Sequence, residues 1–437
     1  MRAILSIILA IGVSHVVATP SLAQTTPAAR SSGGLFGATR SNDLDRNWLN
    51  VSFSLSEAYD TELPLEHTAG LPQNAQPWGG YSTILVGDAD YERSWRRLRI
   101  AATADAAFRY YDGLDRTDAV GYSGGFGAHI PLPGTASLRI DQSAAYSPSY
   151  LYQLFPVSTA PALGDAIVTA PDYQVLQTDS YDYRSNLTFT AGSTRGTSVT
   201  ASGSFDRTDF QEDRARQPKL NAYSGRAAIS HRVTRNVGLS VDYSYRTGDF
   251  ADGTSNEHRL AFGAEYSRPL STSRRATFRL NVTPSTLHIS DDALSSGVAG
   301  RIFRLQGDAS VSYPFRRTWQ VSANVGRRSE YLAVLGEPVL SDAARLSLEG
   351  LLTRRLELLA TAAYAEGASA LNRFNHFDSY TGNVRLRFAL SRGVAIYGEY
   401  LYFSYDYGGA AAFPPDLPRA FEQHGLRIGA TLWVTAF

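Results

Sequence analysis

Arginine and carboxylate side chains recur at alternate positions along this chain, and their spacing indicates what chemistry they could do. Within residues 222–283, Arg226, Asp242 and Glu265 each lie between apolar neighbours. A period of two places such side chains on one face of a strand. Rows of them on adjacent strands can line a water-filled channel and set a transverse field. They can also form a lattice of cross-strand ion pairs that only braces a wall.

The remaining polar residues contain no obvious catalytic, cofactor-binding or metal-binding set. Hydrolases need a nucleophile or base with a nearby His, but the histidines here are scattered, and a solvated strand end explains the one cluster, at residues 288–292. Asp112, Asp115 and Asp118 lack the ordered ligand positions of an EF-hand loop. We therefore predict that the chain is not an enzyme and uses no cofactor or metal.

Composition narrows the class further. The 41 basic and 41 acidic residues balance, so there is no basic excess for binding nucleic acid. The chain has no cysteine, which excludes disulfides and Cys-ligated metal sites. The 43% hydrophobic content, 25 Tyr, 20 Phe and 37 Gly suit membrane strands, which place aromatic residues at the lipid interfaces and small residues where strands crowd.

The elements that must position the charged residues are strands with one apolar and one polar face. Leu239, Val241 and Tyr243 alternate with Ser240, Asp242 and Ser244, for example. The same alternation predicts strands at residues 48–59, 80–92, 97–111, 119–130, 136–147, 179–192, 197–207, 220–233, 237–249, 257–268, 276–289, 301–313, 319–331, 342–353, 356–366, 379–391, 394–406 and 424–436.

The connections between these strands alternate in length. Short turns follow the even strands, as at residues 131–135 and 234–236, and longer loops follow the odd ones, as at residues 247–257. All 19 prolines lie outside the strand centres, as the missing N–H requires. The fold class predicted is all-β: a single transmembrane antiparallel up-and-down β-barrel of about eighteen strands, with sixteen possible.

A barrel of roughly eighteen strands is too wide for side chains to fill. This width favours a polar channel over a purely bracing lattice, although both can hold together. The residues predicted to line the lumen share a charged side chain on the face opposite the apolar one: Arg97, Arg99, Arg139, Asp141, Arg184, Asp242, Arg259, Glu265, Arg279, Arg304, Arg345, Glu349, Arg385, Arg387 and Glu399.

The longest predicted loop, residues 147–178, is the third outer loop. It is far longer than an ordinary connection and is rich in apolar side chains that would form a large patch in water. We expect it to fold into the lumen as a constriction, and its position resembles that of the pore-narrowing loop of general porins. The alternatives are an outer cap, or contact with lipopolysaccharide or a neighbouring subunit. The residues singled out are Tyr150, Tyr152, Phe155, Asp165, Asp172 and Tyr173.

The first residues indicate export. An apolar run after Met1-Arg2 ends at Ser21-Leu22-Ala23, which predicts a signal peptide over residues 1–23. Residues 24–46 are rich in Ser, Gly, Thr and Ala and are predicted to form a flexible lead-in, and residues 47–437 form the barrel. Beyond the signal, no stretch approaches the ~18 to 20 apolar residues of a membrane helix.

The end of the chain carries a resemblance. An alternating strand that contains Trp433 and ends on Phe437 resembles the C-terminal assembly signal of outer-membrane barrels, although the apolar residues Leu432 and Val434 are one position out of step with Phe437. With its Arg-bearing turns and barrel periodicity over residues 47–437, the chain resembles the second β-barrel porin family of Gram-negative bacteria. The resemblance implies an outer-membrane barrel, and some relatives accompany exopolysaccharide export systems.

The sequence thus predicts a porin-like channel in the Gram-negative outer membrane for passive diffusion of small hydrophilic solutes. An exopolysaccharide export barrel is the alternative within transport, and a structural or adhesion barrel is the alternative outside it. The partners expected are outer-membrane lipid, lipopolysaccharide, the barrel-assembly machinery, and small solutes or polysaccharide.

Overall fold

The computed structural model describes residues 48–61, 80–111, 118–147, 180–192, 196–210, 220–250, 253–271, 274–289, 301–315, 318–332, 337–369, 376–406, 408 and 420–436. The described strands are β1 (Trp48–Asp60), β2 (Gly80–Trp95), β3 (Leu98–Tyr111), β4 (Asp118–Pro131), β5 (Ala136–Ser147), β6 (Ser180–Gly192), β7 (Thr197–Phe210), β8 (Leu220–Arg232), β9 (Val237–Phe250), β10 (Gly253–Pro269), β11 (Arg275–Ile289), β12 (Arg301–Pro314), β13 (Gln320–Leu332), β14 (Glu337–Leu351), β15 (Leu356–Ser369), β16 (His376–Ala389), β17 (Val394–Asp406) and β18 (Ala420–Ala436).

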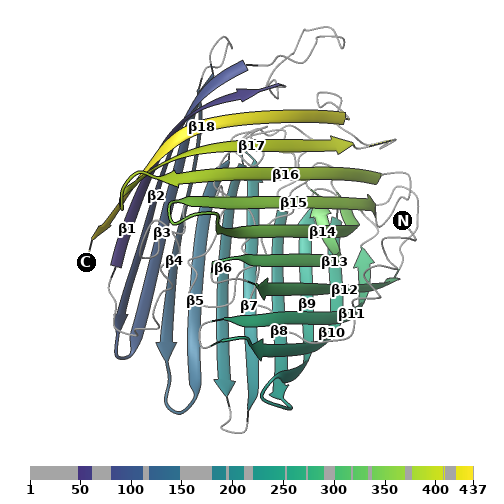
Figure 1. The fold of residues 1–437 in the computed structure, drawn as a ribbon. Coiled ribbons are helices and arrows are strands. Elements are labelled where there is room, and N and C mark those ends of the chain that lie inside the picture. Colours follow the sequence, from purple (N-terminus) through teal and green to yellow (C-terminus); the bar gives the residue numbers. More distant parts are fainter. Residues whose placement is uncertain are drawn as a thin grey trace.

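These strands form one closed antiparallel sheet of eighteen strands (Figure 1). Each strand pairs with its sequence neighbours, and β1 also pairs with β18 from Leu49↔Ala436 to Asp60↔Gly425. Closure leaves no sheet edge along the first and last strands. The predicted fold class is confirmed, with eighteen rather than sixteen strands. In the part of the chain that the structure describes, no helix is long and apolar enough to cross a membrane.

The turns after the even strands are short because their residues bond locally. After β8, the Thr234 hydroxyl oxygen accepts hydrogen bonds from the backbone N–H groups of Asn236 (3.1 Å) and Val237 (3.0 Å). After β14, Thr353 bonds Arg355 and Leu356 in the same way, at 3.2 and 3.0 Å. Such hydroxyl-to-backbone turns replace the ladder where the chain reverses. The predicted short turns are confirmed here.

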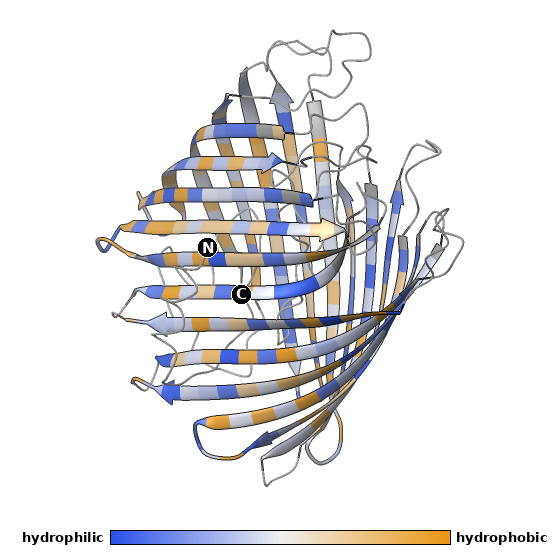
Figure 2. Cartoon of the chain, turned by 90° about the vertical axis from the view of Figure 1, so that its right-hand side faces the viewer, coloured by the Kyte–Doolittle hydropathy of each residue, from blue (hydrophilic) through white to orange (hydrophobic). Residues whose placement is uncertain are grey.

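The two faces of the sheet differ as the alternation predicts. Leu239, Val241 and Tyr243 are exposed, at 51%, 47% and 47%, and Figure 2 shows hydrophobic and hydrophilic bands alternating along the strands. The polar face is the concave one, since its side chains meet across an intervening strand. Ser54 on β1 reaches Tyr397 on β17 at 3.1 Å, past β18. Side chains on a convex face would diverge instead.

Several strands run further than their apolar pattern does, and one predicted loop is wrong. Residues 247–257 were expected to form a long polar loop, but β9 continues to Phe250 and β10 starts at Gly253, with Gly253 paired to Phe250. β7, β14, β16 and β18 are likewise longer at the same end of the barrel than the sequence pattern predicts. The alternation in the sequence detects only the part of a strand in which one face is apolar, whereas the backbone pairing continues beyond that part.

Candidate functional site: the charged inner wall

The concave face carries nearly all the residues predicted to line a lumen. Among the strands, these positions alternate with the exposed apolar ones and include Arg99, Arg139, Asp141, Arg184, Asp242, Arg259, Glu265, Arg279, Arg304, Arg345, Glu349, Arg385, Arg387 and Glu399. Arg97 differs, because it lies in the turn between β2 and β3 and is exposed. The alternation of the sequence therefore places these charges on one face, and their exposure to a water-filled lumen stays a prediction.

A buried ion pair joins β1 to β3 across β2. Arg109 donates from Nη2 to the Asp60 carboxylate and from Nε to the Ser82 hydroxyl on β2, the latter at 3.0 Å. Both charged side chains are only 1% exposed. A buried charge is tolerated only when it is paired and hydrogen-bonded. This pair therefore binds three consecutive strands beside the β1–β18 closure.

A second group of charges continues this wall over β15 to β18. Glu399 accepts a 2.5 Å hydrogen bond from the Asn383 amide and lies 3.7 Å from Arg427 Nη1. Arg427 and Glu399 are 8% and 5% exposed. Arg387 forms an ion pair with Glu357 on the neighbouring strand. These residues occupy register positions that face one another, so each ion pair links adjacent strands.

Aromatic rings lie beneath two arginines of β16 on the inner wall. The Arg387 guanidinium carbon is 5.2 Å from the Trp433 ring centre, and that of Arg385 is 5.8 Å from the Tyr397 ring centre. A guanidinium above a ring face is held electrostatically and keeps its edge available for hydrogen bonds. Trp433 thus belongs to the inner wall. Its predicted role in an assembly signal stays a prediction, and Phe437 lies outside the described residues.

An acidic group lies on β2 and β3. Asp88 and Asp105 are register partners, so their carboxylates project side by side from neighbouring strands. The Ser52 hydroxyl donates to Asp88 at 2.5 Å, and the Ser123 hydroxyl donates to Asp105 at 3.0 Å. Hydroxyl donors stabilise carboxylates without neutralising them. This part of the wall therefore concentrates acidic side chains.

Around the rest of the barrel, basic and acidic residues are paired along and across strands. Arg139 lies 2.7 Å from Asp141, Arg184 lies 2.5 Å from Asp206, and Arg279 lies 3.6 Å from Glu265, while Arg226 is paired with Asp242. The cross-strand pairs are the bracing lattice that the sequence allowed. They do not exclude a channel, because side chains that are paired along the wall do not reach the barrel axis.

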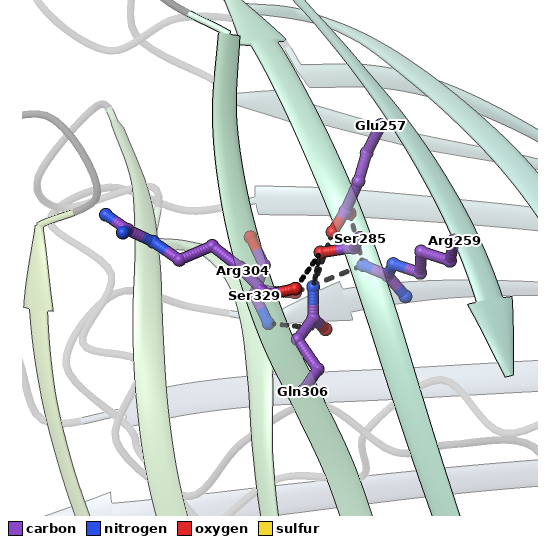
Figure 3. Close-up of polar contacts among 6 residues, drawn as sticks. All are labelled: Glu257, Arg259, Ser285, Arg304, Gln306 and Ser329. Carbon is purple, nitrogen blue, oxygen red and sulfur yellow. Dashed lines mark hydrogen bonds and ion pairs between the residues drawn. The ribbon is translucent and has the colours of Figure 1, made fainter. Parts of the chain in front are cut away.

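Some of this geometry was not foreseen from the sequence. Asp60 lies one residue beyond the predicted end of its strand. Gln306, whose side-chain amide donates to Glu257 and to the Ser285 hydroxyl (Figure 3), carries no charge. Neither residue was therefore singled out. Strand periodicity shows which face a residue is on but not which strand its side chain will reach. The predicted constriction residues, from Tyr150 to Tyr173, lie outside the described residues, as do residues 1–47.

No family model and no curated protein matches the chain, so its resemblance to the second β-barrel porin family stays a prediction. Solved structures of outer-membrane porins are similar to it in fold. Pseudomonas aeruginosa OpdL shares 11% sequence identity at a TM-score of 0.41, with 90% of this chain and 99% of that chain covered.

Pseudomonas aeruginosa OpdK, solved with vanillate, shares 10% identity at a TM-score of 0.45, with 89% and 99% covered. Acinetobacter baumannii OccAB3 shares 9% identity at a TM-score of 0.43, also with 89% and 99% covered. Likeness at this level does not transfer a solute or a binding residue to this chain.

Proposed function

We propose that this protein is an outer-membrane barrel that acts as a porin-like channel for the passive diffusion of small hydrophilic solutes. The observation that carries the proposal is the closed eighteen-stranded sheet with an apolar convex face and a charged concave face. In lipid, a closed sheet is one of the few structures that satisfies its own backbone hydrogen bonds. The Gram-negative outer membrane is where such single-chain barrels with an even strand number occur.

The apolar convex face supports the membrane location. Phe53, Leu85, Phe126, Leu187 and Leu280 come from strands spread around the barrel, and each is more than two-fifths exposed, at 50%, 46%, 48%, 50% and 41%. A continuous surface of this kind would be an aggregation hazard in water. Lipid acyl chains cover it, while the tyrosines on the same face reach the polar interfaces.

The charged concave face supports a channel. The ion pairs described above lie within one strand or join strands no more than two apart, and a barrel of this strand number is too wide for such side chains to fill. Arg184, Arg226 and Arg279 keep 31%, 54% and 31% of their side chains exposed on this face, and Asp206 and Glu265 keep 30% and 49% exposed. Solutes with hydroxyl, carboxylate or ammonium groups would exchange water for these side chains as they pass. Nothing in this role requires catalysis.

We further propose that the third outer loop narrows the channel. Folding inward would cover the aromatic side chains of the loop against the wall and present its carboxylates to the solute. The aromatic residues are Tyr150, Tyr152, Phe155 and Tyr173, and the acidic residues are Asp165 and Asp172.

Single-channel recording of the purified, refolded protein in planar bilayers tests the function. We expect stepwise openings in salt solution, and liposome swelling that is rapid with small sugars and slow with large oligosaccharides. Correctly folded protein without conductance would contradict a channel and favour a structural or adhesion barrel. Entry of long polysaccharide at the rate of small sugars would favour export instead. Heat-modifiable migration in gel electrophoresis is the control for folding.

A further inference from the structure

The convex face carries a cluster of two tyrosines and a histidine towards the end of the barrel opposite the short turns. The Tyr243 hydroxyl on β9 is 2.8 Å from Nδ1 of His258 on β10, and the ring centres of Tyr245 and His258 are 4.9 Å apart. The Tyr245 hydroxyl donates to the Asn256 side chain at 2.8 Å. When the Tyr243 hydroxyl donates to Nδ1, a neutral imidazole carries its hydrogen on Nε2. The exposed His258 can then donate from Nε2 to a further group.

The same arrangement recurs on β17 and β18, with one difference. The Tyr400 hydroxyl is 2.7 Å from His424 Nδ1, and the ring centres of Tyr402 and His424 are 5.1 Å apart. A carboxylate takes the place of the amide, since Glu422 accepts a 3.2 Å hydrogen bond from the Tyr402 hydroxyl and lies 3.5 Å from His424 Nε2. The two clusters therefore share their aromatic geometry and differ in charge.

Basic side chains continue the first cluster along the end of the barrel. Asn256 on β10 is the register partner of His288 on β11, and His288 is the register partner of Arg301 on β12. His288 and Arg301 are exposed and alternate with inward positions, so both lie on the convex face. Opposed residues on one face are close enough to contact one ligand together. We use the name β9–β12 rim for these six residues: Tyr243, Tyr245, Asn256, His258, His288 and Arg301.

Acidic residues are few around this rim. Among the described convex positions of β9 to β12, one carries a carboxylate, Asp249 near the end of β9. It lies three strands from Arg301, which is about 14 Å across the sheet. On the next two strands, Arg327 and Asp342 are paired with each other. The rim therefore offers an anion one guanidinium and two imidazoles, whereas the β17–β18 cluster presents a carboxylate.

The rim lies next to the apolar part of the convex face. Leu260, Phe262 and Val282 follow on the same strands towards the short turns and are 40%, 50% and 43% exposed. In a membrane barrel, tyrosines and polar side chains that border the apolar band lie at the level of the lipid head groups. The rim would therefore face head groups when the apolar band is covered by acyl chains.

We infer that the β9–β12 rim binds the phosphorylated sugar head group of a glycolipid in the outer leaflet. Arg301 and His288 donate to the phosphate, for which the planar guanidinium is suited. His258 and Asn256 bond to sugar hydroxyls. The rim spans four strands, about 14 Å, which fits linked sugars better than a single phosphate. The inference rests on the proposed membrane location and on the orientation of the barrel, but not on the diffusion of solutes.

Native mass spectrometry of the full barrel in detergent tests the inference, with lipid A, a phosphorylated disaccharide lipid, as the probe. We expect saturable retention of lipid A. The same glycolipid after removal of its phosphates, and phosphatidylglycerol, which has a phosphate but no sugar, should each be retained about tenfold more weakly. Equal retention of the dephosphorylated lipid would contradict a phosphate site. Equal retention of phosphatidylglycerol would contradict a glycolipid site.

Variants with matched controls sharpen this test. Arg301→Gln combined with His288→Asn should weaken the retention of lipid A about tenfold, because charge-assisted hydrogen bonds to phosphate are lost. Arg268→Gln is the control for the arginine, since Arg268 is exposed on the same face at the other end of β10. His424→Asn is the control for the histidine, in the cluster that carries a carboxylate. An unchanged retention in the double variant, or an equal loss in either control, would overturn the inference.

A second measurement locates the lipid without altering the rim. The chain has no cysteine, so Thr286→Cys, the register partner of His258, can carry an environment-sensitive fluorophore. Ser404→Cys, the register partner of Glu422, reports on the β17–β18 cluster. Titration with lipid A in micelles should change the emission at position 286 and not at 404. The same change at both positions, or at neither, contradicts the site even if the double variant does not fold. Absent binding in a conducting barrel contradicts this inference and leaves the channel intact.

Discussion

At the scale of single residues, the Asp60–Arg109 pair shows how strongly the inner wall depends on its charges being matched. Both side chains are almost fully covered, so removing one leaves the other charged and without its partner. Asp60→Ala should lower the free energy of unfolding by about 3 to 5 kcal/mol. Urea titration of the protein in lipid bilayers measures this change.

Asp209→Ala is the matched control for this prediction. Asp209 is paired with Arg207 on the same strand, but their side chains are 23% and 45% exposed. Breaking an exposed pair should cost far less, because solvent screens the two charges. Equal losses in the two variants would mean that the burial of Asp60 contributes nothing to stability.

The two faces of β9 give a second prediction at this scale. Val241 is on the convex apolar face, whereas Asp242 is on the concave face and pairs with Arg226. Val241→Arg should cost about 2 to 4 kcal/mol if the residue lies near the bilayer midplane. Asp242→Ala should be tolerated, because its pair is partly exposed. Refolding yield into lipid vesicles compares the variants, and an identical effect would mean that the two faces are not lipid and lumen.

At the scale of elements, the turn before β7 depends on one glycine. Gly196 has a φ of +83°, in the left-handed region, and a Cβ built there would lie 3.2 Å from the Arg232 Cβ. Gly196→Ala should therefore destabilise the barrel by about 1 to 3 kcal/mol. Gly225 in the middle of β8 has open space around its missing Cβ, so Gly225→Ala should be neutral or slightly stabilising. Urea titration in lipid checks both, and the reverse order would contradict the assigned turn conformation.

The strands themselves could be predicted from sequence because their signal is local. The face on which Leu239 lies can be inferred from its immediate neighbours, and the turn at Thr234 contains a residue type that is common in turns. The extension of β9 to Phe250 could not be predicted, because Thr247, Gly248 and Asp249 are polar or small and the alternation no longer distinguishes the two faces. Contacts that skip a strand, such as Asp60 with Arg109 and Gln306 with Glu257, depend on sheet curvature, which has no local sequence signal.

At the scale of the whole molecule, the turns that follow the even strands and both ends of the barrel lie on one side, as Trp48↔Glu92 and Leu49↔Ala436 place them. We predict that this side is periplasmic. The chain has no cysteine, so a Cys introduced at Asn236 or at Asp252 is a label without background. In intact cells, a membrane-impermeant maleimide should modify position 252 and not 236. Permeabilised cells are the control, and the opposite pattern would invert the topology.

The long third loop gives the last prediction. Replacing residues 156–171 with a short Gly-Ser linker should raise single-channel conductance and weaken selectivity if the loop narrows the lumen. A linker of the same kind in place of residues 212–218, in the next outer loop, is the control and should leave conductance unchanged. A correctly folded variant of the third loop with the conductance of the unaltered protein would exclude the constriction.

The β1–β18 pairing has a consequence for biogenesis. Leu49 and Ala436 are neighbours in the finished wall but lie at opposite ends of the chain. Until they meet, β1 and β18 each offer an open edge that can capture other chains, and contacts of such long sequence separation form slowly. A partly formed barrel therefore closes slowly and is prone to aggregate until it has closed. Something must shield these two edges until β1 and β18 pair.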